Sequence, residues 1–453
     1  MELFVKDRSF YRTLGGIAVP ITLQSFISFG LNYVGMILLG RYGEITMSAA
    51  SLSATFYSLF STICNGLGGG AAVLVAQFWG KKDTDSIKDT MSILLKICVG
   101  LSLMFTAVTL AVPDRILSLY TGDETVIKEG VPYLRIMAIG FLFNGLSLAA
   151  TNVLRSIGKV KVPLYTSIAV FVINIFLSYT LIFGHFGAPE LAIRGAAIAT
   201  VTARVVECLA IFGYLVAVDR DVGFRLKDAA RRNGEILKRY LKTGLPVLVS
   251  DALMVLGNNV LIMIIGHTGT EFTAANSIAS VANNLIYMFA YGLCTSSGIM
   301  TGNTIGEGKK EKAYRQGVTF ISLGVIIGIV GSVVLLLVSG PFLSLYDVGE
   351  ETARYARQLL IILSSIYIFQ LMEINFTKGI LRGGGDTRFL IVGDSVFMWT
   401  VSIPLGCLAA FVWGSPIWLV FLLLKVDLIL KTLLCFWRFL SKKWIHDVTV
   451  PEG

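Results

Sequence analysis

Twelve long apolar stretches run through this sequence, and each has about the 20 residues that a helix needs to cross a lipid bilayer. They cover residues 14–39, 47–79, 91–112, 132–154, 162–184, 193–217, 243–266, 272–304, 316–339, 356–380, 389–411 and 416–438. Only 15% of the residues are charged, whereas soluble proteins carry about 25%. The pattern predicts an all-α polytopic membrane protein with twelve transmembrane helices. A membrane β-barrel would instead show short segments of alternating polarity.

Lysine and arginine are concentrated in alternate loops between these stretches, and the richest of these loops is 219–242. Cytoplasmic loops carry such an excess. We therefore expect both termini in the cytoplasm and a location in the inner, or plasma, membrane. The same loops account for the net charge of +9, so nucleic acid is not expected as a partner. Loop 219–242 is expected to be a cytoplasmic linker that forms an amphipathic helix near the anionic lipid surface.

The two halves of the chain repeat one another at an offset of 226 residues, which rises to 227 near the end of the repeat. Matching positions include Pro20 and Pro246, Asn32 and Asn258, Gly66 and Gly292, LSLY at 117–120 and 343–346, and Arg155 and Arg382. Each half contains six stretches, so both enter the membrane in the same direction. We predict two pseudo-symmetric six-helix bundles, residues 1–218 and 243–453, joined by the linker 219–242. Parallel repeats with a substrate cavity at their interface are typical of transporters.

Several short motifs occur in a fixed order along the repeat. They are a proline early in the first stretch, G-R-x-G just after it at 40–43, Q-x-x-G-K-K at 77–82 and L-R-G-G-G-D-T at 381–387. Together they resemble the multidrug and toxic compound extrusion (MATE) family over essentially the whole chain. Asp427, Lys431 and Trp444 look like clostridial-type members. The resemblance implies a cation-coupled antiporter that exports amphiphilic, cationic organic compounds by alternating access. It implies no cofactor, with H⁺ or Na⁺ as the coupling ion.

Polar residues recur every three or four positions along stretch 47–79, so they form one stripe on a helix. Such a stripe is costly against lipid. We expect it to line a water-filled substrate cavity, and helix–helix packing through small residues is the alternative. The expected cavity residues in both halves are Asn32, Ser51, Thr55, Ser58, Asn174, Ser277, Asn284, Tyr287 and Tyr291. The two tyrosines are suited to flat organic cations through cation–π contact, although core packing is the alternative for Tyr287.

Ionisable residues inside membrane spans are costly, so each is a candidate for function. Asp251 lies just after Pro246 and has no cation within four residues of it in the sequence. We expect it to be the first cation-coupling residue and a possible Na⁺ site. Glu373 is the second candidate and Glu207 the third. The acids at 251 and 373 are similar in placement to those of NorM-like MATE proteins.

Three other features of the charged residues bear on the coupling site. Arg204 and Glu207 are spaced i, i+3, and Asp427 and Lys431 i, i+4, so both pairs are expected to form structural ion pairs. Asp394 is expected to pair with Arg388 near the cytoplasmic edge. The essential aspartate that DinF-like members carry in the first span is Gly35 here, so that site is missing.

Two other functions are compatible with a protein of this kind. A lipid-linked oligosaccharide flippase of the same superfamily is one, although such proteins often carry extra spans and a cationic cavity. An intramembrane enzyme is the other, but the sequence has neither H-E-x-x-H nor G-x-S-x-G, and its three histidines are scattered. We therefore do not expect an enzyme. We expect a monomer surrounded by lipid, with small organic molecules as substrates.

Overall fold

The computed structural model describes residues 4–346 and 348–450, with the exception of the side chain of Asn32. Within these ranges the regular structure is helical and no strand occurs. Eleven helices in the described part of the chain are long and apolar enough to cross a membrane. The prediction of an all-α polytopic membrane protein is therefore confirmed.

The helices follow the apolar stretches closely, because those stretches lack helix-breaking clusters between their ends. In the first half they are α1 Arg8–Tyr42, α2 Glu44–Gly80, α3 Thr84–Ala111, α4 Pro113–Ser118, α5 Glu124–Ser156, α6 Lys161–Phe183, η1 His185–Gly187, α7 Ala192–Gly213, η2 Tyr214–Val218 and η3 Leu226–Ala230. In the second half they are α8 Gly234–Thr268, α9 Thr270–Gly306, α10 Lys310–Leu343, α11 Glu350–Ile374, η4 Asn375–Ile380, α12 Leu381–Gly383, α13 Thr387–Ile391, η5 Val392–Val396, η6 Met398–Ser402, α14 Ile403–Cys407, η7 Leu408–Val412, α15 Ile417–Leu423 and α16 Asp427–Leu440.

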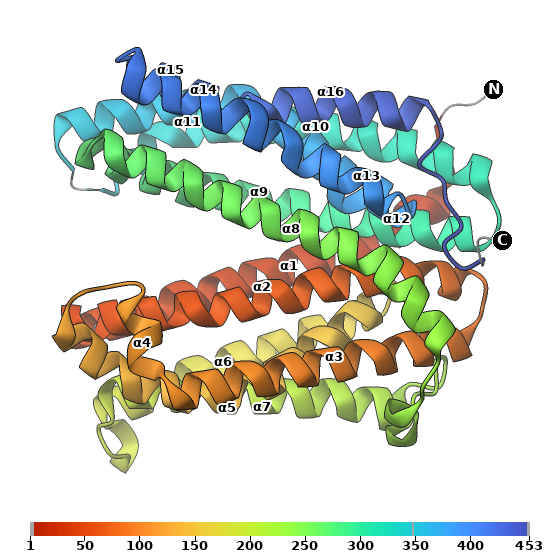
Figure 1. The fold of residues 1–453 in the computed structure, drawn as a ribbon, viewed down its shortest axis with the longest axis horizontal. Helices are drawn as coiled ribbons and strands as arrows, with labels where there is room; N and C mark the ends of the chain where they lie inside the picture. Colours follow the sequence, from red (N-terminus) through yellow and green to blue (C-terminus); the bar gives the residue numbers. More distant parts are fainter. Residues whose placement is uncertain (1–3, 347, 451–453) are drawn as a thin grey trace. The chain divides into compact units, whose positions relative to one another are not determined.

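The chain packs into two compact units. The N unit consists of residues 23–75 and 82–241, and the C unit consists of the described residues 4–22, 76–81, 242–346 and 348–450. In the N unit, α5 packs against α3 and α7, and α6 packs against α7 (Figure 1). In the C unit, α9, α10 and α11 pack against one another, and α16 packs on α11.

The last apolar stretch, 416–438, is two helices and not one. α15 ends at Leu423 and α16 begins at Asp427, where the Ser402 hydroxyl donates to the Asp427 carboxylate at 2.9 Å and accepts from its backbone N–H at 3.0 Å. Serine thereby satisfies a backbone donor that a new helix start leaves open. The break explains why only eleven described helices span continuously where twelve were predicted.

The linker differs from its predicted form. The structure has only the short 3₁₀ helix η3 before Gly234, where α8 begins and continues without interruption into the span. The amphipathic helix predicted for residues 219–242 is therefore wrong. The last nine residues of that range belong to a membrane helix.

The C-terminal turns of α2 and α9 cross one another within the C unit at a symmetric contact. A Cβ atom added to Gly80 would collide with the backbone oxygen of Asn303, and one added to Gly306 would collide with that of Gln77. The sequence repeat relates Gly80 to Gly306 and Gln77 to Asn303. Only glycine allows such close approach of two helix backbones.

The segment that follows α16 is fixed to this crossing. The Gln77 amide donates to the His446 carbonyl at 3.0 Å and accepts from the Val448 N–H at 2.9 Å. Lys81 forms an ion pair with Asp447 at 2.9 Å. Trp444 is fully buried, and its indole N–H donates to the Phe439 carbonyl at 3.0 Å. The end of α2 and residues 444–448 therefore form one connected structure.

Candidate functional site

A cluster of charged side chains lies inside the C unit, where the helices would otherwise be apolar. α8 contributes Asp251, η4 contributes Lys378, α12 contributes Arg382 and η5 contributes Asp394. Both η4 and η5 are π-helical segments, which are rare and are frequently found at functional sites. They continue α11 and α13 along the chain.

The cation Lys378 lies between two carboxylates. Its ammonium group forms an ion pair with Asp251 and is 3.4 Å from Asp394 Oδ2. Arg382 Nη2 also contacts both oxygens of Asp251, at 2.9 and 3.1 Å. The Ser250 hydroxyl donates to Asp394 Oδ2 at 2.7 Å. Each of these two aspartates is therefore neutralised by at least one cation.

Glu373 lies next to this cluster and differs from it. Its side chain is 1% exposed, and Oε1 accepts a hydrogen bond of 3.3 Å from Thr377. Its other oxygen, Oε2, has no hydrogen-bond partner among the described residues, and the same is true of Asp394 Oδ1. One oxygen of each of these two buried carboxyl groups therefore lacks a hydrogen-bond donor among the described residues.

The depth of burial varies across the cluster. Asp394 is 0% exposed and Glu373 1%, whereas 18% of the Asp251 side chain and 20% of the Lys378 side chain are exposed. The ionic cluster therefore reaches the surface of the C unit through Asp251 and Lys378. The side chains of Asp394 and Glu373 are buried more deeply.

Asp251 has cationic partners that lie far from it in the sequence. Lys378 and Arg382 reach it from 127 and 131 residues further along the chain. A Na⁺ site at Asp251 stays a prediction. The expected pairing of Asp394 with Arg388 is wrong, since Lys378 and Ser250 hold Asp394 instead.

The two ion pairs expected from local spacing are present. Arg204 and Glu207 lie 2.7 Å apart in α7, and Lys431 and Asp427 lie 2.7 Å apart in α16. Lys431 is fully buried and Asp427 nearly so. A role for Glu207 in cation coupling stays a prediction.

The predicted cavity residues fall into three groups. Thr55, Ser58, Ser277 and Asn284 are exposed, while Ser51, Tyr287 and Tyr291 are half-buried. Asn174 is buried, and its amide donates to Thr200 at 3.4 Å. The side chain of Asn32 lies outside the described residues. That these residues line a substrate cavity stays a prediction.

The sequence did not predict that Lys378, Arg382, Ser250 and Asp394 belong to one site. The internal repeat could have indicated that three of them lie together. At the repeat offsets, Ser250, Arg382 and Asp394 correspond to Gln24, Arg155 and Ser167. These three residues also form a junction in the N unit, with Gln24 donating to Ser167 at 3.0 Å and Arg155 to Gln24 at 2.5 Å.

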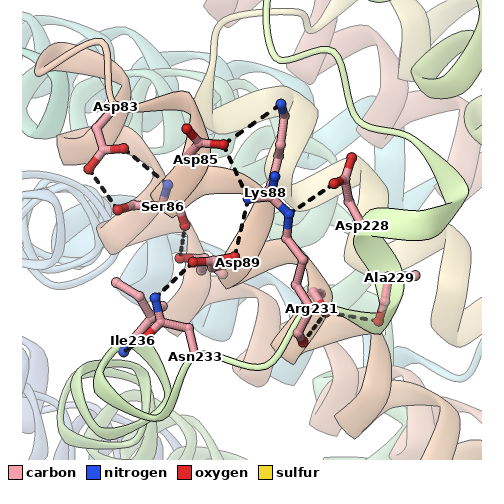
Figure 2. A network of polar contacts seen from close by, with 12 residues as sticks. Asp83, Asp85, Ser86, Lys88, Asp89, Asp228, Ala229, Arg231, Asn233 and Ile236 are labelled. Carbon is pink, nitrogen blue, oxygen red and sulfur yellow. Dashed lines mark hydrogen bonds and ion pairs between the residues drawn. The ribbon is translucent and has the colours of Figure 1, made fainter.

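A second polar cluster joins the linker to the start of α3, as Figure 2 shows. The Arg231 guanidinium contacts Asp228 at 2.9 Å, Asp85 at 3.1 Å and Asp89 at 3.4 Å. Asn233 donates to Asp89 at 2.8 Å. Burial of the Asp228 carboxyl acts to raise its pKa, but the backbone N–H of Arg225 and the charge of Arg231 lower that pKa below its usual value. This cluster anchors the linker and contains no carboxyl without a donor.

The chain is similar to known proteins over most of its length. The sequence model of the MatE family matches residues 20–180 and 246–411. The probable multidrug resistance protein YoeA of Bacillus subtilis is 28% identical over 404 residues, which cover 88% of this chain and 86% of that protein. A probable multidrug resistance protein NorM from Rhodopseudomonas palustris is 26% identical over 439 residues, or 93% of this chain and 90% of that protein.

Solved structures show the same fold. A crystal structure of a MATE protein in its bent conformation superposes with a TM-score of 0.85 at 18% identity, covering 96% of each chain. A transporter of the MOP superfamily from Pyrococcus furiosus superposes with a TM-score of 0.84, also at 18% identity, covering 95% of this chain and 96% of that one.

Proposed function

The chain belongs to the multidrug and toxic compound extrusion (MATE) family of membrane transporters, and from this premise we propose that it exports amphiphilic organic cations in exchange for H⁺ or Na⁺. It is a transporter and not an enzyme. The relatives named as probable multidrug resistance proteins support organic compounds as its substrates.

The observation that carries the proposal is the buried carboxyl group of Glu373. A carboxylate without a cationic partner is costly inside a membrane protein and is a candidate for function. Among the described residues, no cation lies within ion-pair distance of Glu373, whereas Asp251 has two. Glu373 is therefore the first candidate for the coupling residue, ahead of Asp251, with Glu207 third.

Antiport requires that the exported compound and the coupling cation favour different states of the carrier, because a ligand shifts an equilibrium only through differential affinity. A carboxyl group meets this requirement, since its charge attracts an organic cation only while it is ionised. One cation moving inward gains about 2.3 kcal/mol per 100 mV of membrane potential. This sustains roughly a fifty-fold gradient of a compound that moves without net charge.

Transport by the purified protein in liposomes tests the proposal. Efflux of tetraphenylphosphonium should follow an imposed gradient of pH or Na⁺, and Glu373→Gln should reduce it to the level of protein-free liposomes. Asp251→Asn should reduce transport less. If both variants transport like the wild type while Glu207→Gln is inactive, the coupling site lies in the first half and the assignment fails.

We also propose that the chain acts as a monomer in the inner, or plasma, membrane with both termini in the cytoplasm. The excess of lysine and arginine in loops such as 219–233 supports this orientation. A single cysteine introduced at Arg220, which is exposed, should react with a membrane-impermeant maleimide only after the cells are opened. Labelling of intact cells would reverse the topology.

A further inference from the structure

We propose that the linker segment, residues 219–233, binds the headgroups of anionic phospholipids at the membrane surface through its exposed cations and the side chain of Leu226. Lipid binding of this kind is separate from transport, so it goes beyond the proposed function and does not depend on it. The amphipathic helix expected in this part of the chain is not formed. A short turn that is fixed to α3 takes its place.

The acids of the linker segment are all neutralised within the N unit. Asp219 and Asp221 both form ion pairs with Lys159, and Asp228 pairs with Arg231 at 2.9 Å. The other cations of the segment are exposed and form no ion pair with any described residue; they are Arg220, Arg225, Lys227 and Arg232. The segment therefore presents four positive charges that the described structure does not neutralise.

The turn η3 is held in place from its inner side. The Ser92 hydroxyl of α3 donates to the carbonyl oxygens of Ala229 and Arg231 at 2.9 and 3.1 Å. The Arg231 guanidinium contacts Asp85 and Asp89 of α3 (Figure 2). Because the turn is already ordered, a ligand that binds its outer side does not have to order the backbone first. Such preorganisation strengthens binding.

Leu226 is the exposed apolar side chain of this turn. Val222 and Phe224 are only 3% and 1% exposed, whereas Leu226 is 70% exposed. It lies between the exposed side chains of Arg225 and Lys227. Segments that lie at the lipid interface combine apolar side chains, which enter the edge of the acyl region, with cations that meet the phosphate groups. The turn offers both kinds of contact on its outer side.

Lys96 of α3 indicates the level of the lipid headgroups. It is exposed, and its ammonium group donates to the Arg231 carbonyl of the linker segment. Further along α3 the exposed side chains are apolar, as at Leu103 and Val108, and are suited to lipid tails. A lysine at the edge of an apolar surface keeps its charged end among the headgroups. Since Lys96 reaches the linker segment, that segment lies at the same level.

The charge of the segment selects an anionic lipid. Each lysine or arginine near an anionic bilayer strengthens the attraction roughly fivefold. Phosphatidylcholine carries no net charge and gains no such contribution, whereas phosphatidylglycerol carries one negative charge. The exposed cations of the linker segment therefore favour phosphatidylglycerol.

Hydrogen–deuterium exchange of the wild-type protein in lipid nanodiscs tests the contact without any variant. Nanodiscs that contain phosphatidylglycerol should slow the exchange of backbone amides in residues 220–227, compared with nanodiscs of phosphatidylcholine alone. High salt should reduce the difference, because salt screens exposed charges. Equal exchange in the two kinds of nanodisc at low salt would overturn the proposal.

Native mass spectrometry in detergent measures the affinity for the first molecule of phosphatidylglycerol that binds. Arg225→Gln combined with Lys227→Gln should weaken it roughly thirtyfold, because two cations are lost. The matched control is Lys310→Gln combined with Lys443→Gln, which removes the same charge from exposed positions of the C unit. That control should leave the affinity nearly unchanged. Equal losses in the two double variants would reveal a general effect of net charge and refute the site.

Two further measurements separate a lipid from a soluble anion. Leu226→Ser should weaken the binding of phosphatidylglycerol, and unaltered binding would refute the role of Leu226. Glycerophosphoglycerol, which is the same headgroup without acyl chains, should not compete when it is present at the concentration of the lipid. Effective competition at that concentration would identify a site for soluble anions and overturn the lipid as its occupant.

Discussion

The two halves of the repeat build the same helix junction from different chemistry. In the N unit, Gln24, Arg155 and Ser167 join α1, α5 and α6 through one hydrogen bond between neutral side chains and one that the arginine donates. The corresponding positions in the C unit hold Ser250, Arg382 and Asp394, and Asp251 and Lys378 add two further charges. Both arginines leave Nε without a hydrogen-bond partner in the described structure.

The comparison of the two junctions shows that the fold does not require a carboxylate at this position. The first junction packs the three helices without a carboxylate, so a polar contact is enough for this architecture. Replacing buried ion pairs by neutral groups is often neutral or stabilising. The carboxylates of the second junction are thus not explained by stability, and function is the remaining reason for them.

The largest expected effect is on stability, when the equivalent arginines are changed. Arg382→Met leaves Asp251 with one cation fewer, and breaking a buried pair costs about 3–5 kcal/mol. Arg155→Met removes one hydrogen bond from a charged donor to a neutral amide, which is worth about 1.5–3 kcal/mol. Thermal unfolding in detergent should therefore show a lower midpoint for the first variant.

Equal losses for the two variants would mean that the junctions are energetically alike. As a control, Asp251→Asn combined with Arg382→Met should recover part of the loss, because the carboxylate that lacked its partner is then gone.

The second prediction concerns the crossing of α2 and α9, where the two halves are alike. Gly80→Ala and Gly306→Ala both force a methyl group against a backbone oxygen, so each should cost about 1–3 kcal/mol of unfolding free energy. The two losses should be similar. Gly100 lies inside α3 with open space around its Cβ position, so Gly100→Ala should instead be neutral or gain up to about 1 kcal/mol.

The third prediction compares two buried glutamates by thermal unfolding. Glu207 forms an ion pair with Arg204 at 2.7 Å, so Glu207→Gln should lower stability by about 1 kcal/mol. Glu373 has no such partner to lose among the described residues. Glu373→Gln should therefore leave the unfolding midpoint unchanged or raise it. A lower midpoint for Glu373→Gln would mean that a cation does pair with this residue in the membrane protein.

The smallest effect is expected at the segments that follow the sixth helix of each half. After η2, Arg231 holds the linker to α3 and Asp228 of the linker pairs with Arg231 at 2.9 Å. After α16, the exposed pair of Lys442 and Glu311 is 3.4 Å apart. The folded pKa of Asp228 is lowered, so its contribution is present above the usual aspartate pKa and is lost as the pH falls through the folded value. Asp228→Asn should remove a few tenths of a kcal/mol at neutral pH, after allowance for solvent screening.

The same loss should disappear as the pH falls through the lowered pKa of Asp228 in unfolding measurements, because the wild-type carboxyl is then protonated too. Glu311→Gln should have no measurable effect at any pH. A larger loss for Glu311→Gln would show that the two segments are anchored alike.

The sequence predicted those parts of the molecule that depend on local spacing. The length of the apolar stretches predicted the eleven continuous spans, and helical spacing predicted the ion pairs Arg204–Glu207 and Asp427–Lys431. The break between α15 and α16 was missed because it depends on Ser402 in another helix.

The candidate site was predicted only in part, for the same reason. The sequence singled out Asp251 and Glu373 as costly residues in spans, but the partners of Asp251 lie on η4 and α12. The π-helical turns that contain Lys378 and Asp394 carry no simple sequence signal. The ion pairs of Lys378 with Asp251 and Asp394 depend on how three spans pack, and no local pattern contains that information.

The hydrogen bonds of Gln77 to His446 and Val448 join positions 369 and 371 residues apart in the chain. Ribosomes add roughly 5–20 residues per second, so the end of α2 waits roughly 20 to 70 s for these partners after its own synthesis. Gly80 waits for a shorter time, until α9 has been made and Asn303 can pack against it. The first six spans are therefore synthesised before this contact can form. Until residues 446–448 arrive, the Gln77 amide needs other hydrogen-bond partners, such as water.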